Sequence, residues 1–273
     1  MAEFFSLMGP ALLACLALTS IYVYFGIHIV RRGVIFVDLA LAQVAAMGMT
    51  VAFLLGYPLE GKGAYLFSLA FAFFGSIVFA WTREKQGRVS QEATIGIVYA
   101  FAAAATVLLV DKAPHGAEHI KYLLVGKIPW VSRDSLAGLL AVVSAVALFH
   151  FFFRRHFSLA SFHPEKAGDE GVSVPLWDFF FYLSLAWVVT TSVQVAGVLL
   201  IFSFLIVPAV CGILLGTNVK TTLLAGWLTG AGGSFVGSLL SYLWDLPTGA
   251  TIIVTLGLML FFVAAALSLF KSV

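Results

Sequence analysis

The chain has 273 residues, of which 62% are hydrophobic and only 10% are charged, and its formal net charge is +2. Soluble domains are about 45–50% apolar and about 25% charged, so this composition excludes a soluble globular protein and predicts a protein that crosses a membrane several times. The small net charge argues against a nucleic-acid partner. Cys15 and Cys211 lie far apart in apolar runs, so they predict neither a disulfide nor a cysteine metal site.

Apolar runs long enough to cross a bilayer recur along the whole chain. A membrane-spanning helix needs about 20 largely apolar residues, and a helix is the only realistic form for such runs because every backbone amide in lipid must be bonded internally. We therefore predict an all-α, polytopic bundle of eight to nine transmembrane helices that forms one integral membrane domain over 1–273. The predicted spans are 10–30, 35–56, 64–81, 93–110, 135–153, 176–195, 197–216, 221–243 and 250–270. The first run has no basic flank and no cleavage site, so it is expected to be a retained helix.

Lysine and arginine divide unevenly between the two faces that these spans create. Alternate crossing places ten of them on one face and five on the other. Because positive residues favour the cytoplasmic side, we expect the N-terminus outside and the C-terminus in the cytoplasm.

The polar segment 111–134 is too interrupted by Pro114 and Pro129 to be a span. We predict an outer loop with a short interfacial helix around 117–126 and with Trp130 at the headgroup level.

Within this loop, His115, Glu118 and His119 have metal-ligand spacing, which also matches the H-x-x-E-H signature of some metalloproteases. The preceding proline and the short loop argue against a protease helix, so a loose metal-capturing site at the outer mouth and a plain polar loop are the main alternatives.

The longest polar island covers 154–178, and its cytoplasmic part is the loop 154–175. Pro164 suits the first position of a helix, Glu165 complements the positive helix end, and Gly171 can adopt the left-handed conformation that ends the helix. We predict a short surface helix here. From the residues alone, a docking helix for a soluble partner and an ordinary solvated loop are equal alternatives.

Asp38 and Gln43 are polar residues within the second span. Intramembrane ionisable residues are candidates for function because burying a charge in lipid is costly. Asp38 lies close enough to the cytoplasmic interface to be solvated there or paired with Arg31, which favours a structural role. Gln43 lies deeper, where a polar translocation pathway and an interhelical hydrogen bond are equal alternatives.

Later spans add further candidates for that pathway. Pro208 falls in mid-span, where it is expected to bend the helix as a gating feature or a packing kink. Gln194 and Ser203 flank the tight passage between two spans at Gly197.

Two pairs of glycines in the eighth predicted span have a four-residue spacing, namely Gly226 with Gly230 and Gly233 with Gly237. This spacing favours close helix packing within the bundle over a dedicated dimer face. No Gly-x-x-x-x-Gly-Lys-[Ser/Thr] loop occurs in the chain. If ATP drives this protein, another subunit must bind it.

Three stretches together resemble the ABC permease family that imports zinc, manganese or iron. They are Arg31–Phe36 followed by Ala40–Gly48, then Val195–Ala209, and the island residues Glu165, Ala167, Gly171 and Val172. The 122–126 and 245–249 segments also fit.

The resemblance implies two permease copies side by side on two cytoplasmic ATP-binding subunits, in the inner membrane of a prokaryote, with an extracytoplasmic metal-binding protein delivering the ion. Glu165, Ala167 and Gly171 would occupy the groove of the ATPase and transmit its closure to the bundle.

One departure concerns the usual metal ligands of that family. Its members carry an aspartate and a histidine four residues apart in the second span and another histidine in the fourth. Leu39, Gln43 and Ala100 stand at those positions here, and Asp38 is one residue out of register. A neutral glutamine is a poor zinc ligand, so either the usual inner site is missing or the substrate differs.

The sequence therefore predicts a transport subunit without covalent catalysis and without a resident cofactor, whose cargo is a divalent metal ion or a small metal complex. The alternatives are a self-contained secondary transporter and a membrane zinc hydrolase that uses His115, Glu118 and His119.

Overall fold

The computed structural model describes residues 2–59, 61–84, 90–111, 126 and 128–271. Within these residues, nine helices are long and apolar enough to cross a membrane, which confirms the predicted multi-pass, all-α architecture. The long helices are α1 (Ala2–Arg32), α2 (Val37–Leu54), α3 (Lys62–Glu84), α4 (Gln91–Val110), α6 (Arg133–Phe152), α9 (Val174–Ala196), α10 (Val198–Leu215), α11 (Val219–Trp244) and α12 (Thr248–Lys271). The short ones are η1 (Ile128–Trp130), α7 (Arg154–Phe162) and α8 (Pro164–Asp169).

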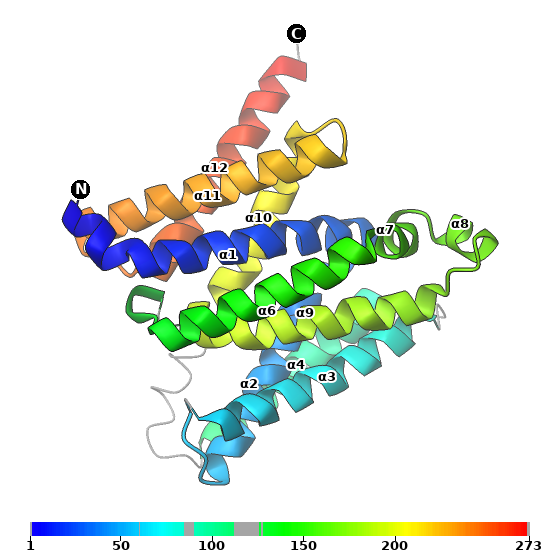
Figure 1. Ribbon diagram of the computed structural model, residues 1–273, viewed down its shortest axis with the longest axis horizontal. Coiled ribbons are helices and arrows are strands. Elements are labelled where there is room, and N and C mark those ends of the chain that lie inside the picture. The colour runs from blue at the N-terminus through cyan, green and yellow to red at the C-terminus, as the bar shows by residue number, and fades with distance from the viewer. Residues whose placement is uncertain (1, 60, 85–89, 112–125, 127, 272–273) are drawn as a thin grey trace.

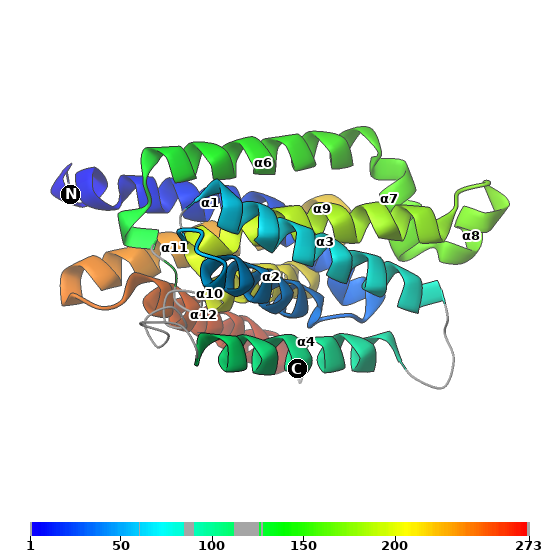
Figure 2. The ribbon, with the colours of Figure 1, turned by 90° about the horizontal axis from the view of Figure 1, so that it is seen from below.

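The long helices form two main groups. Helices α2, α3 and α4 pack together, and α10, α11 and α12 form the second group, while α1 packs on α10 and α11 and α9 packs on α3. Helix α6 lies over α1 and α9, and α4 lies on the opposite side of the bundle from α6 (Figures 1 and 2). Helices α7 and α8 project at one end of the bundle, called here the α8 end.

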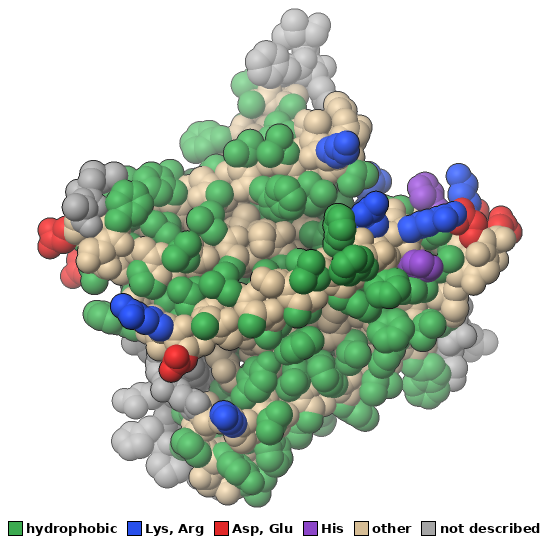
Figure 3. All heavy atoms as spheres, viewed as in Figure 1, with side chains coloured by type: hydrophobic (Ala, Val, Ile, Leu, Met, Phe, Trp, Pro, Cys, Tyr) green, Lys and Arg blue, Asp and Glu red, His purple; other side chains and the backbone are tan. Residues whose placement is uncertain are grey.

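The centre of the bundle is apolar and aromatic, and its outside is apolar as well. Tyr22, Phe25, Phe181 and Tyr182 are among the largest fully buried side chains. Figure 3 shows apolar side chains across the middle of one face, with the charged ones gathered toward its two ends. An apolar middle with charged ends is what a bilayer requires.

Small residues allow the helices to approach closely. A Cβ atom at Gly26 of α1 would lie 2.0 Å from the backbone oxygen of Leu205 in α10. Gly226 and Gly230 lie against α1 and α10, and Gly233 and Gly237 lie against α12. The prediction that the α11 glycines serve packing within the bundle is therefore confirmed. Helix α10 runs continuously through Pro208.

The predicted interfacial helix around 117–126 falls almost wholly outside the described residues. Beyond it, Ile128–Trp130 forms a 3-10 turn, and the Trp130 side chain is 79% exposed. That exposure is consistent with the predicted place of Trp130 at the membrane interface.

Candidate functional site

Helix α8 is the short surface helix that the sequence predicts from Pro164. Pro164 occupies the first turn, and the helix ends in a Schellman motif, in which the Val172 amide donates to the Ala167 carbonyl (2.8 Å) and the Gly171 amide to the Gly168 carbonyl (3.1 Å). Gly171 has φ +70°, a conformation that costs little only for glycine. Ala167 is fully buried, whereas Glu165 is exposed. The helix thus presents a charged face to solvent while one methyl group holds it to the bundle.

Helix α7 precedes α8 and was not predicted. It buries Phe157, Ala160 and Ser161 against the bundle. Phe157 stacks on His150 of α6 with ring centroids 3.9 Å apart, and it meets Trp177 of α9 edge to face at 5.1 Å. The polar island is therefore anchored by an amphipathic helix rather than being a free loop.

A buried ion network links this anchor to three spans. Asp178 of α9 forms an ion pair with Arg32 of α1, whose Nη1 atom lies 2.9 Å from Asp178 Oδ1, and the same Oδ1 atom accepts a hydrogen bond from Arg83 of α3. The Arg32 side chain is fully buried and that of Asp178 is 2% exposed. The Arg32 guanidinium also lies over the Phe181 ring, 3.9 Å from its centroid, an arrangement that favours a cation.

The same two arginines reach α7 from the bundle. Arg32 Nε and Nη2 donate to Ser161 Oγ at 2.9 and 2.7 Å, and Arg83 Nη2 donates to the Ala160 carbonyl at 3.2 Å. Removing one partner from such a buried charge group costs about 3–5 kcal/mol because the remaining charge is left uncompensated. The network therefore couples the position of α7, and of α8 after it, to the ends of α1, α3 and α9.

Two buried histidines extend this polar layer into the bundle. His28 Nδ1 is 2.8 Å from Ser161 Oγ, while His150 is 3.1 Å from Tyr24 Oη and 2.7 Å from Ser184 Oγ. These contacts join α1, α6, α7 and α9. They give hydrogen-bond partners to histidine ring nitrogens, which would be costly to bury without one.

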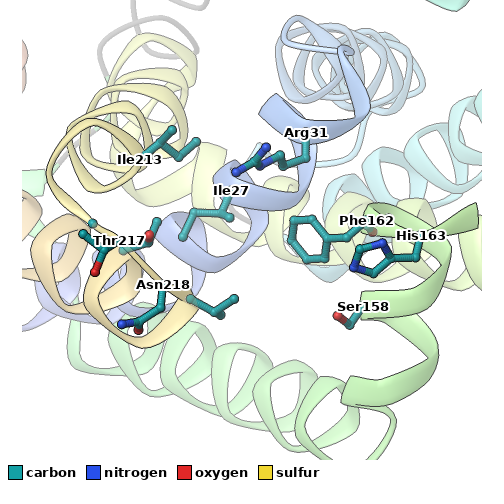
Figure 4. Close-up of a pocket in the computed structure, with 12 residues that line it drawn as sticks. Ile27, Arg31, Ser158, Phe162, His163, Ile213, Thr217 and Asn218 are labelled. Atoms are coloured by element: carbon teal, nitrogen blue, oxygen red, sulfur yellow. The ribbon is translucent and has the colours of Figure 1, made fainter.

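A cavity of about 490 Å³ opens beside α7 at the α8 end (Figure 4). Arg31, His163, Thr217 and Asn218 contribute polar groups to its wall. They come from the end of α1, the residue between α7 and α8, and the turn before α11. Arg31 is exposed here, unlike its buried neighbour Arg32.

The interpretation of Asp38 as solvated or paired with Arg31 is wrong. Asp38 is 2% exposed, and its Oδ1 atom has no hydrogen-bond partner among the described residues. Arg31 lines the cavity described above, and the buried arginine next to it pairs with Asp178 instead. The distance of Asp38 from Arg31 along the chain did not reveal that its side chain turns into the bundle.

The other pathway candidates lie on three helices. Gln43 is half-buried on α2 together with Leu39, and Ala100 is exposed on α4. Ser203 donates to the Leu199 carbonyl within α10 (2.9 Å), Pro208 is buried in the same helix, and Gln194 is half-buried near the end of α9. The stacked rings of Phe36 and Phe202, 6.1 Å apart, bring α2 and α10 together.

None of these candidates forms a metal-ligand cluster. Among the described residues, no group of three or more histidine, cysteine, aspartate or glutamate side chains is arranged to hold a metal ion. His115, Glu118 and His119 lie outside the described residues, so their assignment stays a prediction.

The sequence signal for the ion network was present but incomplete. Arg32 and Arg83 end two spans and Asp178 begins a third, all on the face that carries most of the positive charge. Nothing in the chain shows that they meet, because Arg83 and Asp178 are 95 residues apart.

Comparison with known proteins decides the family. The sequence model of the ABC 3 transport family matches residues 4–268. The chain belongs to the ABC 3 transport family. As a member, it is a membrane transport component rather than an enzyme, so the hydrolase alternative is wrong.

Relatives of this ABC 3 family chain resemble it along almost its whole length. A protein of Haemophilus influenzae named "Probable iron transport system membrane protein" is 27% identical, with 91% of this chain and 89% of the relative covered. The manganese transport system membrane protein MntC of Listeria monocytogenes is 24% identical, with 95% and 90% covered. A structure of PsaBC from Streptococcus pneumoniae in complex with a Fab has a TM-score of 0.81 at 20% identity, covering 96% of this chain and 94% of that one; this likeness shows the fold.

Proposed function

We propose that this chain is the permease subunit of an ATP-driven importer for a divalent transition-metal ion of the manganese or iron type. Support comes from the cargo in the names of its relatives, which are manganese and iron transport proteins. An extracytoplasmic metal-binding protein would deliver the ion, and a second copy of the permease would complete the pathway.

The observation that carries the proposal is the exposed helix α8, braced by buried charges at the ends of three spans. The chain lacks a nucleotide-binding loop, so a separate subunit must bind ATP. Glu165 and the rest of the exposed face of α8 offer that subunit a docking surface. Because α7 and α8 are linked to α1, α3 and α9 through Arg32, Arg83 and Asp178, movement of the docked subunit would be transmitted to the bundle.

Alternating access follows from that linkage. An ATP-bound and an ATP-free partner would favour different arrangements of α8, and the permease would shift between states by the difference in binding free energy. The excess of lysine and arginine on the α8 face supports a cytoplasmic position for it, and in this proposal the N-terminus lies outside and the C-terminus inside.

The polar residues of α2 that we propose for the ion pathway favour a hard cation. Gln43 and Asp38 offer oxygen atoms. Carboxylate and carbonyl oxygens suit manganese better than thiolate and thioether ligands do. In one copy they do not converge, since five positions along a helix separate them by about 140°. Ligands from the second copy or a hydrated ion would complete the coordination.

The test combines co-purification with uptake. A tagged chain expressed with its neighbouring genes should retain an ATP-binding subunit, and cells should accumulate labelled manganese or iron. Glu165→Lys should reduce both. Asp134→Lys is the matched control, because Asp134 is an exposed acid in the first turn of α6 at the opposite end.

A chain that retains no ATP-binding subunit, and that transports equally well with Glu165→Lys, would be a self-contained secondary transporter, and the proposal would fail. Accumulation of zinc alone would retain the ATP-driven mechanism and overturn the assigned cargo.

A further inference from the structure

A second, larger cavity adjoins the one shown in Figure 4. It has a volume of about 920 Å³ and lies between α1, α6, α7 and α11. The two cavities share Ser158, Phe162 and Val219 in their walls, so a polar chamber at the α8 end continues into a groove along the spans. None of the proposed transport residues lines either cavity.

The walls of the larger groove are apolar. Its lining includes Ile21, Ala147, Leu148, Phe151, Leu223 and Trp227. His28 and His150 also line it, but their hydrogen bonds to Ser161, Tyr24 and Ser184 occupy ring nitrogens. Both ring nitrogens of His150 and Nδ1 of His28 are thus paired within the protein, and much of the remaining wall consists of ring faces and aliphatic groups.

The length of the groove matches part of one bilayer leaflet. Its lining runs from Ser20 to His28 on α1 and from Val219 to Trp227 on α11. Eight residues of helix rise by about 12 Å, and one leaflet of the hydrocarbon core is about 15 Å thick. The groove therefore starts at the end of the spans and reaches most of the way to the membrane centre.

Basic side chains stand where this groove meets the membrane surface. Arg154 follows the end of α6 and lines the groove, and Arg31 lines the adjoining polar chamber. Among the described residues, neither is in an ion pair, whereas Arg155 beside them pairs with Glu170 at 2.7 Å. The Arg154 guanidinium lies over the Phe151 ring, 4.9 Å from its centroid, and both residues line the groove.

We propose that this composite cavity binds an anionic phospholipid, with an acyl chain between α1, α6 and α11 and the phosphate near Arg31 and Arg154. Charge complementarity selects the anionic headgroup, and the continuous apolar groove selects a lipid over free phosphate. The lipid would lie against Phe162, three residues before Glu165 of α8. It would therefore hold the α7 anchor from the membrane side.

The experiment compares lipid retention and stability. The transporter, with the subunits that co-purify with it, is extracted in mild detergent, and its bound phospholipids are quantified by mass spectrometry. We expect phosphatidylglycerol or cardiolipin to be retained in preference to phosphatidylethanolamine. Micelles containing phosphatidylglycerol should raise the melting temperature of the delipidated protein, whereas phosphatidylcholine and inorganic phosphate should not.

Two variants test the two halves of the site. The double substitution Arg31→Gln with Arg154→Gln should lower retention of anionic lipid at least about tenfold, since each basic side chain near an anionic headgroup contributes several-fold. Arg133→Gln removes an exposed arginine at the other end of α6 and should have no effect. Ala147→Trp should fill the groove and displace the lipid, while Ala141→Trp, exposed on the same helix but outside the lining, should not.

Equal retention in the double variant and in Arg133→Gln would overturn the proposal, as would equal retention of neutral and anionic lipids. If the double variant loses the ATP-binding subunit at unchanged lipid content, these arginines belong to the docking surface of that subunit instead. If inorganic phosphate alone stabilises the protein, the cavity binds a free anion and not a phospholipid, and the proposal fails.

Discussion

The α8 end and the middle of the bundle hold their helices together in different ways. At the α8 end, Arg32, Arg83 and Asp178 join three spans through charge, and Ser161 connects them to α7. In the middle, contacts such as Gly26 against Leu205 bring backbones together with no charge involved. The chain thus uses buried charge at the end where we propose that movement is passed on, and close packing where helices stay together.

The buried ion network at the α8 end and the weakly polar interior of the bundle also suit two different functions. Coupling needs a fixed geometry between distant chain segments, and a buried ion network supplies it because its partners are costly to separate. A pathway for an ion needs weak, replaceable contacts, and the half-buried face of α2 with Leu39 and Gln43, which we propose for that pathway, provides few polar groups. An importer that held its ion by strong ligands in mid-membrane would release it slowly.

The strongest test of the comparison is Asp178→Asn. It removes the only carboxylate that Arg32 and Arg83 share among the described residues and should destabilise the protein by about 3–5 kcal/mol, because the fully buried Arg32 and the partly buried Arg83 lose their counter-charge. Thermal unfolding in detergent and the yield of folded protein measure the effect. Asp169→Asn, on the exposed face of α8, should change stability by less than about 0.5 kcal/mol. Equal melting temperatures for the two variants would show that the network is not needed for the α8 end.

The middle of the bundle is tested by Gly26→Ala. The new methyl group would lie 2.0 Å from the Leu205 carbonyl oxygen, so α1 and α10 must separate, at a cost of about 1–3 kcal/mol. Gly9→Ala is the control on the same helix, because a Cβ atom there meets nothing within 4 Å and alanine is the better helix former. Thermal unfolding should show a loss for the first variant and no loss for the second. A Gly26→Ala protein as stable as Gly9→Ala would mean that α1 and α10 can separate freely.

Much of this fold is readable from the sequence because lipid imposes simple rules. Each span follows from the length of its apolar run, and α8 follows from the local signals at Pro164 and Gly171. Helix α7 was missed because it is only nine residues long, begins with two arginines, and has its buried Phe157 and Ala160 next to serines. Length and hydropathy, which identify spans, carry no signal for so short an anchor.

The polar site was less predictable, since it depends on side-chain direction and on pairing across the chain. His28 and Ser161 are 133 residues apart, yet they share a hydrogen bond. Arg31 and Arg32 are adjacent, yet one is exposed and the other has a fully buried side chain. Such outcomes follow from the packing of whole helices, which no local pattern encodes.

The face of α2 is tested by Gln43→Leu, which keeps the size of the side chain and removes its oxygen. If this half-buried face lines the pathway, the apparent affinity for manganese should fall about tenfold, the equivalent of about 1.4 kcal/mol. Stability should change little, because the residue is only half-buried. Met47→Leu, one turn further along and also half-buried, is the control. Uptake curves that coincide for the two variants would remove Gln43 from the pathway.

The smallest expected effect concerns the end of α8. Gly171→Ala places a Cβ atom at φ +70°, which costs about 1–2 kcal/mol. Since α8 is exposed, this cost should loosen α8 locally and leave global unfolding almost unchanged. A 1 kcal/mol shift lowers the ratio of formed to loosened α8 about fivefold, so uptake should fall by up to that factor at a nearly constant melting temperature. Gly168→Ala adds the same methyl group three residues earlier, where nothing lies within 4 Å and φ is not positive, and it should leave uptake unchanged. If both variants transport like the wild type, the shape of α8 is not what connects the bundle to its energy source.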